Sequence, residues 1–402
     1  MTNSQNSSSN NTNTDEGNIL REVVHKKKKY SKDIIVTSSG HTKYGRRKKK
    51  EDIFANSKKV QKKLCIISII LLVVALTIFA IFKIISLKGK NALLMSNKPI
   101  NVTPVDDAQT DDDGNTIIYK GETYRFNKNL LSVVFLGVDN SVLDNSDQTG
   151  DRESGRADAI YIIAYDTVSH KCSMIPISRD TMVDVDLYST DGTPVGIETS
   201  QISLSYGYGK NKETACANTL TSLSRLFYNL QFTNCIALNW DGIGPLSDAV
   251  GGVSLVALQD IKTEKSSIAK GDYVTLKGDD AWSYVKYRDI SKLESNPERV
   301  ERQKQFMGQF ANNVILLTQA NPSFLGDLFD TGKNYMYSTL DRSSAIYLGS
   351  EIISNLTSSN DVHIVDIGGE IKNDGVYAAF YPDETSLFEV LLRVFYLKDV
   401  EP

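Results

Sequence analysis

The chain has 402 residues and a formal net charge of −4, with four cysteines and four histidines. No CxxC pair and no other ligand-like spacing occurs, which argues against a zinc site and a disulfide framework. The small number of histidines argues weakly against a Ser/His hydrolase and an HExxH peptidase. The near-neutral total hides two parts of opposite sign. Residues 21–63 carry 16 lysines and arginines against four acids, whereas residues 86–402 carry 28 against 43, so the second part is not expected to bind nucleic acid.

The N-terminal part is expected to be a tail followed by a membrane span. Residues 1–63 are predicted to form a disordered basic tail, because the first 20 are mostly Asn, Ser and Thr and can bury too little apolar surface to offset the entropy of ordering. Residues 64–86 begin with 19 uncharged, mostly apolar residues, enough for a helix to cross a hydrocarbon core. Because basic residues collect on the cytoplasmic side of a span, the sequence predicts a single-pass membrane protein with a cytoplasmic N-terminus and an extracellular remainder.

Residues 87–115 are expected to be an acidic extracellular linker. Two prolines and five aspartates fall between positions 97 and 114, with little apolar content, which is typical of a solvated spacer. The extracellular domain then spans 116–402 and begins with a small hairpin over 115–124.

A buried strand is predicted over 131–139, where Leu-Ser-Val-Val-Phe-Leu-Gly-Val leads to Asp139. Open α/β sheets place ligand-binding residues at the carboxyl ends of their strands. Asp139 is therefore the first candidate metal ligand. Residues 141–153 have no hydrophobic period and are interpreted as a loop, which either covers the site or is an ordinary surface loop.

Residues 156–180 predict a β-hairpin, since two apolar, β-branched runs flank a short polar turn. With the turn centred midway, antiparallel pairing sets Asp158 opposite Arg179, and Arg156 joins them at the open end. Arginine matches phosphate oxygens two at a time, and aspartate suits magnesium or manganese. The hairpin thus indicates a metal-assisted phosphate site, with a surface ion pair as the alternative for any single pair.

The elements that follow argue for an α/β sandwich, a central mixed β-sheet flanked by helices. Residues 181–197 are interpreted as a loop, and residues 202–209 alternate in polarity before they end at glycines. A helix is predicted over 214–230, a strand over 235–240, and a short helix within 241–253 that leads into another strand.

Two more groups of residues are candidates for binding an anion. Lys286 and Arg288 stand two apart, so in an extended segment both side chains leave the same face. Arg299, Arg302 and Gln303 share one face of the first turns of the next predicted helix, where free backbone N–H groups also favour anions. Solvated charges on a strand end and on a helix face are the alternatives.

The C-terminal part is interpreted as packing that completes the same domain. The helix that starts at Asn296 and Pro297 runs to about 318. An apolar stretch at 324–329, a helix at 343–354, a strand from His363 and a final helix at 383–397 follow, and none shows obvious chemistry.

Six motifs occur in order within residues 130–318. They are Leu136-Gly-Val-Asp139, Arg156-Ala-Asp158, Pro176-Ile-Ser-Arg179-Asp-Thr-Met, Asp248-Ala-Val-Gly-Gly-Val253, Leu276-Lys-Gly-Asp-Asp-Ala-Trp-Ser-Tyr-Val-Lys286-Tyr-Arg288 and Arg299-Val-Glu-Arg302-Gln303. Together with the short tail and the single span, this set resembles the LytR-CpsA-Psr family of Gram-positive bacteria.

The resemblance implies a metal-dependent phosphotransferase. Family members move an anionic glycopolymer, such as wall teichoic acid or capsular polysaccharide, from a polyprenyl-pyrophosphate carrier to peptidoglycan, with Mg²⁺ (or Mn²⁺). It implies that Asp139 and Asp158 hold the metal. The pyrophosphate would be bound by Arg156, Arg179, Lys286, Arg288, Arg299, Arg302 and Gln303, with Arg156, Asp158 and Arg179 catalytic. A pyrophosphatase that needs no acceptor and a non-catalytic envelope or transcription regulator are the alternative functions.

The chain departs from the family pattern at three places. Lys286 replaces the first arginine of an Arg-x-Arg pair, which keeps the charge and loses the bidentate fork. Asn296 replaces an aspartate before the helix, and Asn140-Ser141 replaces an arginine after the first aspartate. A polyprenyl chain would also need an apolar tunnel, which the sheet and the helix at 297–318 can line, but the sequence does not separate a tunnel from an ordinary core.

Overall fold

The computed structural model describes residues 93, 102, 105, 107–111, 113–139, 155–189, 192–287, 295–373 and 378–399. All of them belong to one compact unit, Ile78–Pro402. The predicted tail, the predicted span at 64–86 and the predicted loop at 141–153 lie outside these residues. Within the described part, no helix combines the length and apolar character that a membrane crossing requires.

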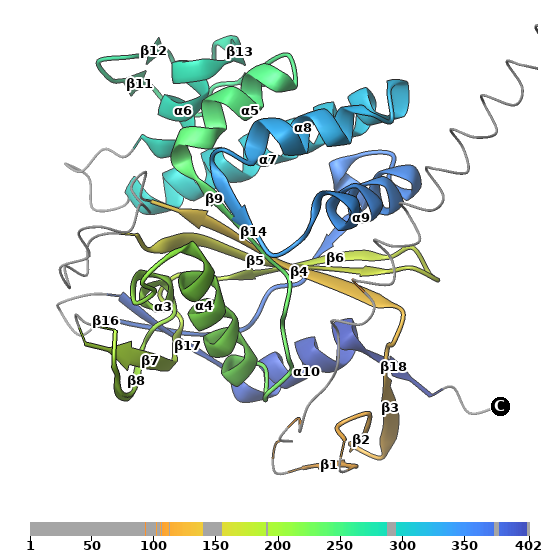
Figure 1. Cartoon of the computed structure of the whole chain (residues 1–402). Coiled ribbons are helices and arrows are strands. Elements are labelled where there is room, and N and C mark those ends of the chain that lie inside the picture. The colour runs from red at the N-terminus through yellow and green to blue at the C-terminus, as the bar shows by residue number, and fades with distance from the viewer. Residues whose placement is uncertain are drawn as a thin grey trace, which may run out of the picture. The chain divides into compact units, whose positions relative to one another are not determined.

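A six-stranded mixed sheet forms the centre, with the strand order β14-β9-β4-β5-β6-β15 (Figure 1). β4 is parallel to β9 and antiparallel to β5, and β6 is antiparallel to β5 and parallel to β15. The strands are β4 Leu130–Val138, β5 Ala157–Asp166, β6 Cys172–Ile177, β9 Cys235–Asn239, β14 Met336–Ser338 and β15 Val362–Ile364.

Helices cover both faces of this sheet (Figure 1). One face carries α3 Ser203–Gly207, α4 Lys212–Leu226 and α10 Glu384–Phe395, and the other carries α5 Ile243–Ala249, α7 Ser295–Ala320, α8 Phe324–Gly332 and α9 Arg342–Asn355. Because side chains alternate along a strand, Val134 and Leu136 of β4 pack with α4 and α10, whereas Leu131 and Val133 pack with α9. The predicted α/β sandwich is therefore confirmed.

Smaller elements surround the sandwich. A second sheet has the order β1-β2-β3-β18, and its first strand, β1 Ala108–Thr110, falls inside the range interpreted as a linker. Its other strands are β2 Thr116–Tyr119, β3 Glu122–Phe126 and β18 Tyr396–Lys398. The remaining described elements are β7 Met182–Tyr188, β8 Pro194–Gln201, η1 Trp240–Gly242, β10 Val253–Val256, β11 Ile261–Lys262, β12 Ser267–Ile268, β13 Tyr273–Leu276, α6 Gly278–Lys286, η2 Ser359–Asp361, β16 Gly369–Asn373 and β17 Ala378–Pro382.

The predicted loop at 181–197 is wrong, because most of it forms the hairpin of β7 and β8. Only Val183 and Val185 of β7 are buried apolar side chains, so the hydrophobic alternation is too short to indicate a strand. The residue after Val185, Asp186, accepts a 2.8 Å hydrogen bond from Arg225 of α4. Tertiary contacts thus hold a strand that looks like a polar loop in the sequence.

Two other segments differ from what their local pattern suggests. Residues 202–209 alternate in polarity but contain the short helix α3, whose Ser203 and Ser205 are buried. The hydroxyl of Ser205 donates to the carbonyl of Ile202 at 2.6 Å, which allows this polar side chain to be buried. Buried serines between apolar residues give the sequence an alternation of polarity that resembles that of a strand. Lys286, expected in an extended segment, is instead the last residue of α6.

Candidate active site

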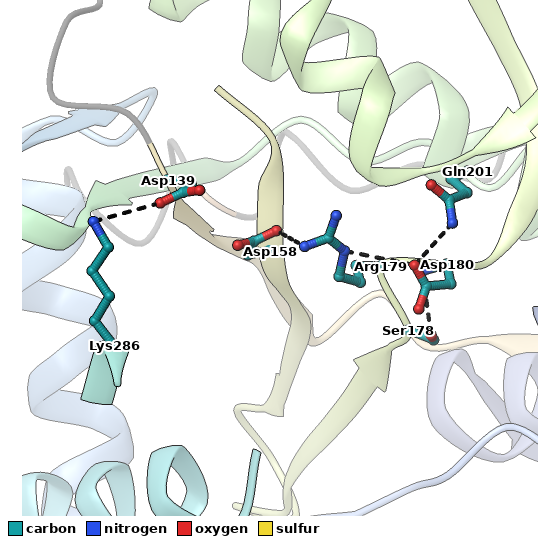
Figure 2. Close-up of polar contacts among 7 residues, drawn as sticks. All are labelled: Asp139, Asp158, Ser178, Arg179, Asp180, Gln201 and Lys286. Carbon is teal, nitrogen blue, oxygen red and sulfur yellow. Dashed lines mark hydrogen bonds and ion pairs between the residues drawn. The ribbon is translucent and has the colours of Figure 1, made fainter. Parts of the chain in front are cut away.

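The hairpin of β5 and β6 forms the centre of the site, and its register is the predicted one. Ile160 pairs with Ile177 and Tyr165 with Cys172. Continued outward, this register sets Asp158 opposite Arg179, and Nη1 of Arg179 donates to Oδ1 of Asp158 (Figure 2). The Asp158 side chain is 8% exposed and that of Arg179 is 23% exposed, so this ion pair is shielded from water.

A bulge between β4 and β5 sets the position of Asp158. Gly137 of β4 pairs with Ala159, but the next residue, Val138, pairs with Ala157. Asp158 is therefore the extra residue on β5. Bulges of this kind bend a strand and redirect a side chain, often beside an active site. Asp158 turns toward Arg179 at the end of β6 (Figure 2).

Asp180 and Gln201 extend the network on the side of β8. Oδ1 of Asp180 lies 3.6 Å from Nε of Arg179 and accepts a 2.9 Å hydrogen bond from Nε2 of Gln201. The backbone N–H of Asp180 donates to the hydroxyl of Ser178 at 3.3 Å. The amide of Gln201 also donates to the carbonyl of Ala378 at 2.9 Å. Figure 2 shows these side chains continuing the row from Asp158.

Sequence reasoning gave no role to Asp180 and did not consider Gln201. Asp180 directly follows Arg179 in one of the quoted motifs, and this adjacency is a signal that could have identified it. Gln201 ends β8 in a segment whose strand was not predicted, and no local pattern marks it. The C-terminal part also reaches the site, because the Phe380 N–H donates to the Asp180 carbonyl at 2.8 Å.

Asp139 and Lys286 form the other end of the row (Figure 2). Nζ of Lys286 lies 3.9 Å from Oδ1 of Asp139, and the two side chains are 41% and 50% exposed. Lys286 also lies over the ring of Trp282, 4.8 Å from its centroid. This long, exposed contact is weaker than the shielded pair of Asp158 and Arg179. Arg288 is outside the described residues.

The structure brings Arg156 and Arg299 to the same carboxylates. The backbone N–H of Asp139 donates to the carbonyl of Arg156 at 3.2 Å. The positive charge of Arg299 opposes the rise in pKa that burial causes at both Asp158 and Asp180, and the positive charge of Arg156 opposes it at Asp180. Both arginines therefore belong to the cluster.

Arg302 and Gln303 are turned toward α6. Arg302 is 1% exposed, and its guanidinium donates to the carbonyls of Tyr284 and Tyr287 and to the side chain of Gln259. Nε2 of Gln303 lies 3.4 Å from the carbonyl of Val285. The guanidinium of Arg302 thus makes its hydrogen bonds within the protein, whereas Arg156, Arg179, Lys286 and Arg299 lie near the carboxylates.

The carboxylates of the site are electrostatically coupled. Burial raises the pKa of Asp158, the charges of Arg179 and Arg299 oppose that rise, and the negative charge of Asp139 adds to it. Burial likewise raises the pKa of Asp180, against the effect of Arg179. Asp139 and Asp158 thus lie close enough to repel each other, which is an arrangement that a cation relieves.

The residues present fit a magnesium ion only if a substrate completes its coordination. In the described ranges no group of three or more His, Cys, Asp or Glu side chains could hold a metal. Asp139 and Asp158 offer two carboxylates, and Mg²⁺ is commonly bound through one or two carboxylates together with substrate phosphates and water.

A large apolar cavity begins next to the polar cluster. It has a volume of about 430 Å³ and lies between the central sheet and helices α7, α8 and α9. Three of its lining residues, Gly137, Ala159 and Val285, stand one or two positions from Asp139, Asp158 and Lys286. The lining comprises Phe135, Gly137, Ala159, Tyr161, Ile163, Met174, Ile236, Leu238, Asn239, Trp240, Ile243, Leu246, Val285, Gln303, Phe306, Met307, Phe310, Leu325, Leu328, Phe329, Gly332, Met336 and Ala345.

The cavity shows that the space between α7 and the sheet is not a filled core. Met307 and Phe310 of α7, in the helix that the sequence assigned either to a tunnel or to an ordinary core, line open space together with the sheet. The stretch at 324–329, interpreted as packing, contributes Leu325, Leu328 and Phe329 to the wall. Polar and apolar parts of one site therefore meet at the end of the sheet.

Comparison with known proteins gives a consistent result. The profile of the LytR_cpsA_psr family matches residues 97–392. A Bacillus cereus protein named polyisoprenyl-teichoic acid–peptidoglycan teichoic acid transferase TagU is 23% identical over 254 residues, which are 63% of this chain and 74% of that protein. A protein of the same name from Oceanobacillus iheyensis is 22% identical over 260 residues, 64% of this chain and 73% of its own. The crystal structure of B. subtilis TagV superimposes with a TM-score of 0.52 at 18% identity, over 66% of this chain and 95% of that one, which shows a shared fold.

Proposed function

The chain belongs to the LytR-CpsA-Psr family, and on this premise we propose that it is a membrane-anchored phosphotransferase that moves an anionic glycopolymer from a polyprenyl-pyrophosphate carrier to peptidoglycan. The observation that carries the proposal is a cluster of cations beside an apolar cavity, whose lining includes direct neighbours of Asp158 and Lys286. A lipid-linked pyrophosphate has the matching chemistry, an anionic head joined to a long apolar chain. The names of the two TagU relatives specify a polyisoprenyl-linked donor and a peptidoglycan acceptor.

We propose that the pyrophosphate lies among Arg156, Arg179, Lys286 and Arg299, with Arg288 and Gln303 as further candidate contacts. Phosphoryl transfer is accelerated mainly by positioning and by fixed cations that stabilise charge on the leaving group. Arg179 is central, because it already contacts carboxylates on both of its sides. For Arg302 we propose a positioning role, since its hydrogen bonds fix the end of α6 where Lys286 stands.

The carrier chain would occupy the cavity, and the acceptor would approach from the opposite end of the row. An in-line displacement needs the attacking and leaving oxygens on opposite sides of phosphorus. Val285, beside Lys286, lines the cavity, whereas Asp180 and Gln201 lie at the far end (Figure 2). The hydroxyl of a peptidoglycan sugar, such as the 6-hydroxyl of N-acetylmuramic acid, would attack the glycan-side phosphorus there. Its new P–O bond replaces the bond to polyprenyl phosphate, which departs.

Asp180 is the carboxylate that we propose to accept the proton of this hydroxyl. Its side chain is 26% exposed, against 8% for Asp158, and Asp158 is committed to Arg179. Gln201 and Arg179 hold Asp180 in place. Asp139 and Asp158 would instead hold Mg²⁺, with Mn²⁺ as a substitute. When bound, the ion would neutralise charge on the pyrophosphate.

The topology is part of the proposal. Residues 64–86 would anchor the chain in the cell membrane with residues 1–63 in the cytoplasm, since the uncharged run follows a strongly basic segment. This arrangement keeps the domain that contains the site on the side where peptidoglycan is found.

The test is a reconstituted transfer reaction with the full chain in detergent, a polyprenyl-pyrophosphoryl glycan, peptidoglycan oligomers and Mg²⁺, followed by mass spectrometry. We expect a glycan joined to peptidoglycan through a phosphodiester and its loss in Arg179→Ala. Arg225→Ala is the matched control, because Arg225 is similarly exposed (27%) and also pairs with an aspartate, Asp186, outside the site. Free glycan phosphate made without acceptor would indicate a pyrophosphatase. No turnover of intact carriers, with function lost only when the tail is removed, would indicate a regulator.

A further inference from the structure

Two buried cysteines lie side by side on the face of the sheet away from the cavity. Cys216 belongs to α4 and Cys235 is the first residue of β9. Their Sγ atoms are 3.0 Å apart, and the residues are 1% and 0% exposed. We propose that Cys216 and Cys235 form a disulfide bond in the mature protein. This inference rests on the extracellular placement in the proposed function, because disulfides persist in oxidising compartments.

The third cysteine of the domain is excluded from the bond. Cys172 lies on β6 in a different core cluster, with Tyr165 and Ile315, whereas Cys216 and Cys235 share the core of α4 and α10. Burial raises the pKa of the Cys172 thiol to about 11, so little reactive thiolate forms. The odd number of cysteines outside the predicted span therefore divides into one pair and one inert thiol.

The bond must form before the domain closes. In the exchange, the two thiols lose two protons and two electrons, and the disulfide of an extracellular thiol–disulfide oxidoreductase accepts them and becomes a dithiol. One S–S bond forms as two S–H bonds break. Both sulfurs are enclosed once α4 packs on β9, so we expect the native bond to resist external reductants.

The position of the bond suggests what it stabilises. Cys235 and Ala237 face the core under α4, whereas Ile236 and Leu238 of the same strand face the cavity. A strand beside open space lacks part of the packing that normally holds it. A covalent link from β9 to α4 would compensate on the opposite face and keep one wall of the cavity in place.

Peptide mapping of the full chain tests the inference directly. Protein isolated from membranes is denatured in guanidinium with N-ethylmaleimide and no reductant, then digested with trypsin. Cleavage after Lys212, Arg225 and Lys262 puts the two cysteines in different peptides, 213–225 and 226–262. We expect the linked pair, which separates on reduction. Recovery of both peptides singly alkylated without reductant would overturn the proposal.

Cysteine variants allow the number of free thiols to be counted independently. Unreduced, denatured wild-type chain should bind two maleimides, at Cys65 and Cys172, whereas Cys235→Ser should bind three and Cys172→Ser one. Four in the wild type would again overturn the proposal. Cys235→Ser should also melt several degrees lower than Cys172→Ser, because it alone removes a cross-link that restricts the unfolded chain. Protease treatment of intact cells tests the extracellular placement of the domain separately. If the protease cleaves the domain from outside and its cysteines are nevertheless all reduced, the disulfide is refuted while the proposed transfer reaction is unaffected.

Discussion

Replacing Ala345 with leucine should block part of the cavity and weaken the use of long carriers. Ala345 of α9 lines the cavity and packs against the cluster of Leu131 and Val133. Val133 is six positions before Asp139, which corresponds to about 20 Å along a strand. The change is therefore remote from the polar cluster and leaves its charges and hydrogen bonds in place.

The expected size of the effect follows from the carbon atoms exchanged. Leucine adds three carbons, which displace about three methylene groups of a bound chain at about 0.8 kcal/mol each. The resulting loss of about 2.4 kcal/mol corresponds to roughly a 50-fold fall in kcat/KM. The added carbons enter open space, so the melting temperature should stay equal or rise.

The assay compares carriers of different chain length in the transfer reaction. A long-chain carrier should lose the full factor in Ala345→Leu, whereas a short-chain carrier that does not reach Ala345 should be used normally. Ala217→Leu makes the same chemical change at an exposed position of α4 and should affect neither carrier. Unchanged kcat/KM with the long carrier, or an equal loss with both, would refute the assignment of the cavity to the carrier.

Three further changes separate charge, geometry and pH. Arg179→Lys keeps the charge but loses the fork that contacts two aspartates, so kcat should fall about 10- to 100-fold while KM changes less; wild-type kcat would contradict a bidentate role. Lys286→Arg should retain activity within about threefold, and Lys286→Ala should lose about 100-fold, measured in the same assay; equal activities would remove Lys286 from the site. At the hairpin turn, burial tends to raise the pKa of Asp166, but hydrogen bonds from the Val168 N–H and from Asn127 outweigh it and hold that pKa below its usual value. Stability from this lowered pKa is present above the unfolded value of about 4 and is lost as pH falls through the folded pKa. Asp166→Asn should therefore melt lower at neutral pH and lose less on acidification, and parallel acid curves for the two proteins would contradict this.

The hairpin at the centre of the site was predictable because its determinants are local. Two apolar runs flank one short turn, and the position of this turn fixes the register that sets Asp158 opposite Arg179. The α7 helix was predictable for a similar reason, since its apolar residues recur with the helical period. Local patterns also singled out Arg156, Lys286 and Arg299, which lie near the carboxylates in the structure, although the helix that carries Lys286 was missed.

The rest depends on contacts between distant segments. Gln201 reaches the site because β8 pairs with β7 and because its amide binds Ala378, 177 positions away. The cavity has no signature of its own, since a phenylalanine that lines open space looks the same in a sequence as one in a filled core. The position of Arg302 likewise depends on Gln259 and on α6.

The paired state of the cations bears on how the proposed substrate would bind. Within the described site, Arg179 forms ion pairs with Asp158 and Asp180, and Lys286 lies near Asp139. A shielded ion pair gains little net stability, because desolvation offsets much of the attraction. Its useful property here is that Arg179 is held in one orientation by Asp158, whose neighbour Ala159 lines the apolar cavity. On the proposed function, phosphate oxygens would replace carboxylate oxygens as partners of a guanidinium already in place, so binding would exchange one ion pair for another and require little new ordering. The cost of assembling the cations is thus met during folding, when the bulge at Asp158 and the register of β5 and β6 are set.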